Sequence, residues 1–169
     1  MPSTYTPIAS TTTSNNTTTE ISFSSISGYT DLLLVQSLPN DPNGTYGYSN
    51  MRFNSDTTNA YGSNYFYYYN GVTPGRQTST TSLLLSGTSS YMGNASIITS
   101  ILNYANPNVY KTVLSRANMN QNGGGVAAET FIFAGAWRSN SAITSVQIFT
   151  GATGYSTGST FTIYGILAA

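Results

Sequence analysis

The chain has 169 residues, carries no net charge and has only 6% charged residues, where a soluble protein has about 25%. Nucleic acids and anionic membranes are recognised by basic surfaces, so we expect neither as a partner of this chain. Cysteine and histidine are absent, which excludes disulfides and removes the commonest metal ligands and general base, so we expect no metal, no cofactor and no catalytic residue.

The first half of the chain alternates apolar, β-branched runs with segments rich in Pro, Asn and Gly. TTTSNNTTTE (11–20) is polar and of low complexity, and is interpreted either as a solvated hairpin loop or as an arm that orders on a partner. TDLLLVQSL (30–38) is apolar almost throughout, as expected of a strand buried on both faces. The strands predicted in this half are 5–10, 20–26, 30–38, 51–55 and 64–70, with a loop at 39–50.

The second half continues the same pattern of short apolar runs separated by turn signals. The segment 71–80 contains Pro and Gly and is predicted to be a loop, as is 119–125 with its three consecutive glycines. That glycine run lacks the Lys-Ser/Thr ending of a phosphate-binding loop. The strands predicted in this half are 80–87, 96–104, 109–118, 128–138, 142–151 and 159–166.

About ten short strands at this spacing are typical of an all-β sandwich or barrel. Aromatic residues make up 13% of the chain, which argues against disorder despite the low charge. We predict an antiparallel β-sandwich, with residues 1–18 as an N-terminal strand or arm and residues 19–169 as a single domain.

The stretch NYFYYYN (64–70) is the most aromatic part of the chain. In a strand, Tyr65, Tyr67 and Tyr69 lie on one face, and Phe66 and Tyr68 lie on the other. One interpretation places Phe66 and Tyr68 in the core and the three tyrosines in cross-strand pairs. The alternatives make the three-tyrosine face a protein interface or a platform on which sugar rings stack.

A few other residues invite both a structural and a functional interpretation. Arg52 and Asp56, four positions apart, are predicted to form an exposed or a buried ion pair. Trp137, with Arg138 next to it, is interpreted as a cation–π unit, as an interface anchor or as a core residue. The five acidic residues show no spacing typical of a catalytic pair; two of them meeting in space as in glycoside hydrolases is the weakest hypothesis.

The last predicted strand, STFTIYGI (159–166), has two faces that differ little in polarity. Phe161 and Ile163 lie on one face, and Tyr164 and Ile166 lie on the other. A strand with one solvated face ordinarily shows a clearer alternation, so we expect Tyr164 and Ile166 to face another sheet or another subunit.

Three stretches together carry a family resemblance: STYTPIAS…ISFSSISGYTDLLLVQS (3–37), MRFNSDTTNAY (51–61) and AGAWRSNSAITSVQIFTGATGYSTGSTFTIYGI (134–166). The chain resembles a group of small β-rich virion proteins of tailed phages, particularly phages of cyanobacteria and other aquatic bacteria. The resemblance covers both ends of the chain and one central segment, and residues from about 62 to 130 match it only in general character.

The resemblance implies a jelly-roll-like β-sandwich that oligomerises on the outside of a virion. The first expectation is a capsid decoration, or cement, protein that forms a homo-oligomer, most simply a trimer, binds the major capsid protein and stabilises the head shell. The alternative is a receptor-binding module at a tail or fibre tip, whose loops 39–50, 71–80 and 119–125 contact a host glycan or surface protein. A cellular lectin is a third, weaker alternative.

The candidate interface residues are aromatic or large apolar side chains on predicted strands, because such side chains are enriched at protein interfaces. They are Tyr5, Ile8, Tyr65, Tyr67, Tyr69, Trp137 and Tyr164.

Overall fold

A computed structural model describes residues 4–39, 48–68, 71–87, 92–121, 128–151 and 154–167. Over these residues the chain forms twelve strands and no helix, and all the strand pairs of its two sheets are antiparallel. The prediction of an all-β sandwich is therefore confirmed, whereas the jelly-roll likeness remains a prediction.

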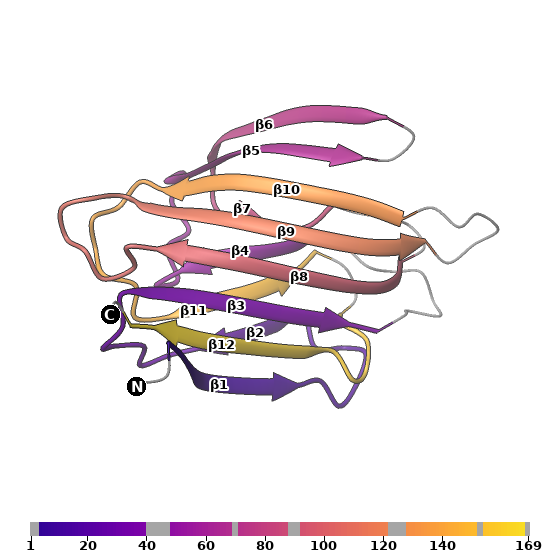
Figure 1. The fold of residues 1–169 in the computed structure, drawn as a ribbon, viewed down its shortest axis with the longest axis horizontal. Coiled ribbons are helices and arrows are strands. Elements are labelled where there is room, and N and C mark those ends of the chain that lie inside the picture. The colour runs from indigo at the N-terminus through magenta and orange to yellow at the C-terminus, as the bar shows by residue number, and fades with distance from the viewer. Residues whose placement is uncertain are drawn as a thin grey trace.

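The larger sheet has eight strands and forms the front layer in Figure 1. Its last strand along the chain lies between the first and third strands, so the C-terminal strand is paired on both edges. From one edge to the other, the strands are β1 (Tyr5–Thr12), β12 (Thr160–Ile166), β3 (Asp31–Leu38), β8 (Met92–Leu102), β9 (Lys111–Gln121), β10 (Ala128–Trp137), β5 (Tyr61–Tyr68) and β6 (Val72–Thr80).

The smaller sheet has four strands and lies behind the larger one in Figure 1. Its strands in order are β2 (Glu20–Phe23), β11 (Val146–Thr150), β4 (Ser49–Phe53) and β7 (Leu83–Leu84). The predicted strand 80–87 is thus reduced to two paired residues. Because the sandwich has two layers, this sheet covers only one face of the larger sheet.

The core lies between the two sheets and is built by alternation along each strand. In β10, for example, Phe131 and Phe133 are buried while Ile132 between them is 43% exposed. The principal core side chains are Leu32, Leu34, Ile97, Ile101, Phe131 and Phe133 from the larger sheet and Ile21, Phe23, Met51, Phe53, Val146 and Ile148 from the smaller one.

The prediction of a loop at 71–80 is wrong, because these residues form the edge strand β6. Pro74 and Gly75 suggested a turn, yet both suit an edge strand. Proline lacks a backbone N–H, a loss that is tolerated at a sheet edge. A Cβ at Gly75 would lie 2.2 Å from Cζ of Tyr65, so glycine here gives the Tyr65 ring room to pack across the strand pair.

The N-terminal segment is part of the sandwich. Residues 5–12 pair with β12 along its whole length, with a bulge between Pro7 and Ala9. Beyond β1, Thr13 is buried, and Oδ1 of Asn16 accepts hydrogen bonds from the backbone N–H (2.7 Å) and hydroxyl (2.8 Å) of Thr157. The segment is therefore held against the residues that precede β12 and is not a free arm. It is not a hairpin loop either, because β1 and β2 lie in different sheets and do not pair.

Candidate functional site: the outer sheet face and an arginine-rimmed hollow

The outer face of the larger sheet, turned away from the smaller sheet, is uncovered (Figure 1). The strand register identifies its side chains, because residues directly opposite each other in antiparallel strands point to the same face. Of the twelve large hydrophobic side chains that are exposed in the described part of the chain, eight lie on this face. They are Tyr5, Phe66, Tyr68, Val72, Ile98, Leu102, Leu114 and Ile132.

Four apolar residues and one arginine of this outer face form a row from β8 to β6. Ile98 lies opposite Arg116, Arg116 opposite Ile132, Ile132 opposite Phe66, and Phe66 opposite Pro74. Arg116 is the only charged residue of this row and has no hydrogen-bond partner within the described residues. A concentration of exposed apolar side chains on one face of a protein ordinarily marks an interaction site.

Two of the predicted interface residues lie on this outer face. Tyr164 is opposite Pro7 and Leu33, and Tyr5 is opposite Ile166. Tyr5 is among the most exposed large side chains of the chain, and Tyr164 is half-buried.

Most of the other predicted interface residues face the core instead. Ile8, at the bulge of β1, is partly buried against the core, and Trp137 is fully inside it. Tyr65 and Tyr67 lie on the inner face, with ring centroids 5.4 Å from Phe133 and 5.7 Å from Phe131 respectively.

The interpretation that places Phe66 and Tyr68 of β5 in the core is wrong. Both side chains are on the outer face, 55% and 56% exposed. An alternating strand defines two faces, but which face is buried depends on the strand and sheet that it packs against, here β10 and the core. Tyr69 lies outside the described residues.

Trp137 is anchored in the core by both packing and a hydrogen bond. Its ring stacks on Tyr61, with centroids 6.2 Å apart, and lies 5.6 Å from Phe53. Its Nε1 donates to Oδ2 of Asp56 at 2.7 Å. Burial raises the pKa of Tyr61 to about 12, and the Tyr61 hydroxyl in turn accepts the N–H of Phe53 at 3.1 Å.

Arg52 and Asp56, which were predicted to form an ion pair, instead contact different groups. Nε of Arg52 donates to the carbonyl of Thr81 at 3.1 Å, and its guanidinium lies over the Phe149 ring, 4.6 Å from the centroid. Asp56 accepts from Thr58 and Trp137. The two charges therefore act on each other only at longer range, and each has a structural role.

We predict that Asp56 makes stability depend on acidic pH. The pKa of Asp56 lies below its usual value, chiefly because its carboxylate accepts a hydrogen bond from the hydroxyl of Thr58. Burial acts in the opposite direction and raises the pKa, and the hydrogen bond from Trp137 lowers it further. A carboxyl whose pKa is lowered by folding stabilises the fold above its unfolded pKa, and this contribution is lost as pH falls through the folded pKa. Asp56→Asn should therefore lower the free energy of unfolding by about 1–2 kcal/mol at neutral pH, and by progressively less as pH falls through the lowered pKa of the folded state.

The measurement is urea unfolding of both chains across acidic pH, with Glu20→Gln as the control. Glu20 is an exposed acid on β2 whose hydrogen bonds are to Ser22 and Gln147. A difference between wild type and Asp56→Asn that stayed constant with pH would contradict the assignment.

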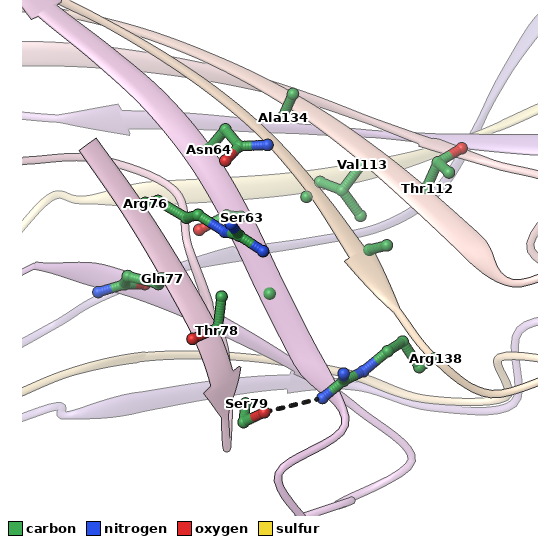
Figure 2. A pocket seen from close by; sticks show the side chains of 13 residues that line it. Ser63, Asn64, Arg76, Gln77, Thr78, Ser79, Thr112, Val113, Ala134 and Arg138 are labelled. Carbon is green, nitrogen blue, oxygen red and sulfur yellow. Dashed lines mark hydrogen bonds between the residues drawn. The ribbon is translucent and has the colours of Figure 1, made fainter. Parts of the chain in front are cut away.

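The second feature of the site is a hollow of about 410 Å³ where β9, β10, β5 and β6 lie side by side (Figure 2). Small residues form its floor, and two arginines reach it from β6 and from the end of β10. The lining residues are Gly62, Ser63, Asn64, Arg76, Gln77, Thr78, Ser79, Thr112, Val113, Ala134, Gly135, Ala136 and Arg138.

The two arginines of the hollow have no carboxylate among its lining residues. Nη2 of Arg138 donates to the carbonyl of Asn59 at 2.5 Å and to Oγ of Ser79 at 3.4 Å, both neutral acceptors. Arg76 lies across β5 in Figure 2 and has no hydrogen bond within the described residues. Sequence reasoning missed this site, because it treated Arg76 as part of a loop and Arg138 as a neighbour of Trp137.

A third cation, Lys111, has a structural role. It is fully buried at the start of β9, and burial lowers the pKa of its ammonium group. Nζ donates to the carbonyls of Asn106, Val109 (2.9 Å) and Asn140 (3.3 Å). The side chain thus joins the segments that precede β9 and follow β10, and its donors satisfy backbone acceptors that would otherwise be buried without a partner.

Within the described ranges there is no group of three or more acidic residues that could hold a metal ion, and no helix long and apolar enough to cross a membrane. The chain matches no known family model and no curated protein.

Proposed function

We propose that this chain is a structural protein of a tailed-phage virion, specifically a decoration protein that forms a homo-oligomer and binds the outside of the head shell. The proposal includes no catalytic role, metal or cofactor. Two independent lines support it: the resemblance carried by 3–37, 51–61 and 134–166, and the uncovered outer face of the larger sheet. The observation that carries the proposal is the concentration of exposed apolar side chains on that outer face.

The size of the outer face suits a stable interface. Eight strands at about 4.8 Å spacing span roughly 34 Å, and seven residues along a strand extend about 24 Å. The product is about 800 Å², which is the area that each partner contributes to a standard protein interface.

The distribution of apolar side chains on the outer face suits a trimer. A closed ring of three copies requires two different patches on each copy, one for each neighbour. The half of the sheet from β1 to β8 offers Tyr5, Leu33 and Ile98, and the half from β9 to β6 offers Leu114 and Phe66. Three such sheets facing a common axis would bury both halves of each.

A decoration protein of this kind acts by mass action. Copies that bind only the assembled shell stabilise that shell by RT ln(1 + [L]/Kd) for each site. The low charge of the chain fits such a role, since a nearly neutral surface does little to keep copies apart.

The copy number per purified virion tests this proposal, measured by quantitative mass spectrometry against the major capsid protein. A decoration protein predicts a copy number that scales with the number of capsid subunits. A few copies per particle would instead favour a tail or fibre location, and absence from the virion would contradict the proposal.

A receptor-binding module at a tail or fibre tip is the second candidate function. The observation that favours it is the arginine-rimmed hollow, since a polar concave site suits a small ligand better than a flat shell contact does. Segment 71–80, expected to be a receptor-binding loop, is the strand β6 and contributes Arg76, Gln77, Thr78 and Ser79 to this hollow. Host range that changes with Arg76 would support this candidate.

A further inference from the structure

We infer that the hollow between β9, β10, β5 and β6 binds an acidic sugar residue, whose carboxylate or sulfate group is held by Arg76 and Arg138. The hollow opens on the outer face of the larger sheet, which the proposed trimer covers, so this assignment concerns the chain before assembly and competes with burial of that end of the face.

The positive charge of the hollow favours an anionic ligand. The chain has five basic residues in all, and two of them line this one hollow without an acidic residue beside them. The hydrogen bonds of Arg138 to Asn59 and Ser79 hold its guanidinium in place without neutralising it. A planar guanidinium matches the geometry of carboxylates and sulfate-like groups, to which it donates two parallel hydrogen bonds.

The remaining lining residues call for a ligand rich in hydroxyl groups. The lining includes the hydroxyl and amide residues Asn64, Thr78, Ser79 and Thr112 on the side of the sheet to which the arginines point, and Gln77 on β6. These groups both donate and accept hydrogen bonds, as sugar hydroxyls do. A volume of about 410 Å³ falls within the range of about 300–1,000 Å³ that is typical of small-molecule sites.

The floor of the hollow argues against a peptide ligand. β9, β10 and β5 are each paired on both edges, so their backbone groups are not free to bind an extended chain. The apolar part of the lining is limited to the small side chains of Ala134, Ala136 and Val113, which offer no deep pocket for a large apolar anchor. Nucleic acid is disfavoured because two arginines do not make the basic stripe that it requires.

Isothermal titration of the full chain tests the assignment with three probes: a galacturonic acid trisaccharide, a chondroitin sulfate disaccharide and neutral maltotriose. We expect one or both acidic sugars to bind and maltotriose not to bind. The two acidic probes distinguish a carboxylate from a sulfate as the recognised group. Affinity for the acidic sugar should fall as ionic strength rises, because part of it is electrostatic.

Three variants locate the binding in the hollow. Arg76→Gln should weaken binding at least about tenfold, since it removes one of two charged donors without breaking a hydrogen bond within the described structure. Ala134→Leu should also abolish binding by filling the floor. Arg116→Gln is the matched control, because Arg116 is exposed on the same outer face but does not line the hollow, and its affinity should stay within about twofold of wild type.

Three results would overturn the inference. They are equal binding of maltotriose and an acidic sugar, an equal loss in Arg116→Gln and Arg76→Gln, and no binding of either acidic probe at millimolar concentration. Thermal unfolding of each variant shows whether it is folded. If Ala134→Leu does not fold, the test rests on Arg76→Gln. The titration is made at concentrations where the chain is monomeric, so that the hollow is open whether or not the chain assembles. Copy number in a virion is a separate measurement, so the sugar site and the decoration role can fail separately.

Discussion

Replacing Ile132 with lysine is expected to prevent the proposed oligomer from forming, with the affinity between copies falling at least about 100-fold. Ile132 lies in the middle of the outer face, between Arg116 and Phe66 on the neighbouring strands. A lysine there would remove an apolar side chain from the middle of the face and place a second positive charge directly opposite Arg116. The two like charges repel each other and the lysine must also be desolvated, so association should weaken strongly.

The measurement is analytical ultracentrifugation of wild type and Ile132→Lys at the same concentration. Val109→Lys is the matched control, since Val109 is 39% exposed, close to the 43% of Ile132, but lies between β8 and β9 and not on the outer face. We expect Val109→Lys to assemble as wild type does. Equal association of Ile132→Lys and wild type would rule out this face as the interface.

Replacing Trp137 with alanine is expected to lower the free energy of unfolding by about 3–5 kcal/mol. The change removes the ring that stacks on Tyr61 and packs on Phe53, and it leaves Oδ2 of Asp56 without the Nε1 donor. The loss is a large part of the roughly 5–15 kcal/mol that stabilises a typical domain. If Trp137 were an exposed interface anchor, the same change would instead lower affinity for a partner and leave stability nearly unchanged.

Far-UV circular dichroism in denaturant is the suitable measurement, because Trp137 is the only tryptophan and its fluorescence is lost in the variant. Trp137→Phe keeps much of the packing and removes the hydrogen bond, so it should cost about 1–3 kcal/mol. Tyr110→Ala is the control, since Tyr110 is 55% exposed and its loss should change stability by no more than about 0.5 kcal/mol. An unchanged unfolding midpoint in Trp137→Ala would contradict the structure of this core.

The fold class and most of the strands could be predicted from the sequence, because alternation and turn residues are local signals. β12 illustrates this: its alternation of β-branched and aromatic residues predicts a strand, and the structure has one there. Tyr164 lies on the outer face, which no other sheet covers, so its contact with another subunit stays a prediction. Which face of β5 is buried could not be predicted, because both faces are aromatic and only the pairing with β10 decides between them. Pro74 and Gly75 led to the prediction of a loop, because proline and glycine are common in turns but also occur in edge strands.

The candidate site could be predicted only in part. Tyr5 and Tyr164 were identified from residue type, but the rest of the outer face depends on the order of eight strands, which the sequence does not reveal. The hollow brings together Arg76 and Arg138 from strands far apart in the chain, and no local motif marks either residue. The burial of Lys111 is equally a product of tertiary structure, since its three acceptors come from two separate segments.

The central claim is that the outer face of the larger sheet is buried in the assembled protein. Hydroxyl-radical labelling read by mass spectrometry tests it most directly, by comparing Phe66 and Tyr68 on that face with Tyr110, which is exposed elsewhere. In wild type, Phe66 and Tyr68 should be labelled much more slowly than in Ile132→Lys, while Tyr110 is labelled equally in both. Equal labelling of Phe66 and Tyr68 in the two proteins would contradict the claim and leave the outer face as ordinary solvent-exposed surface.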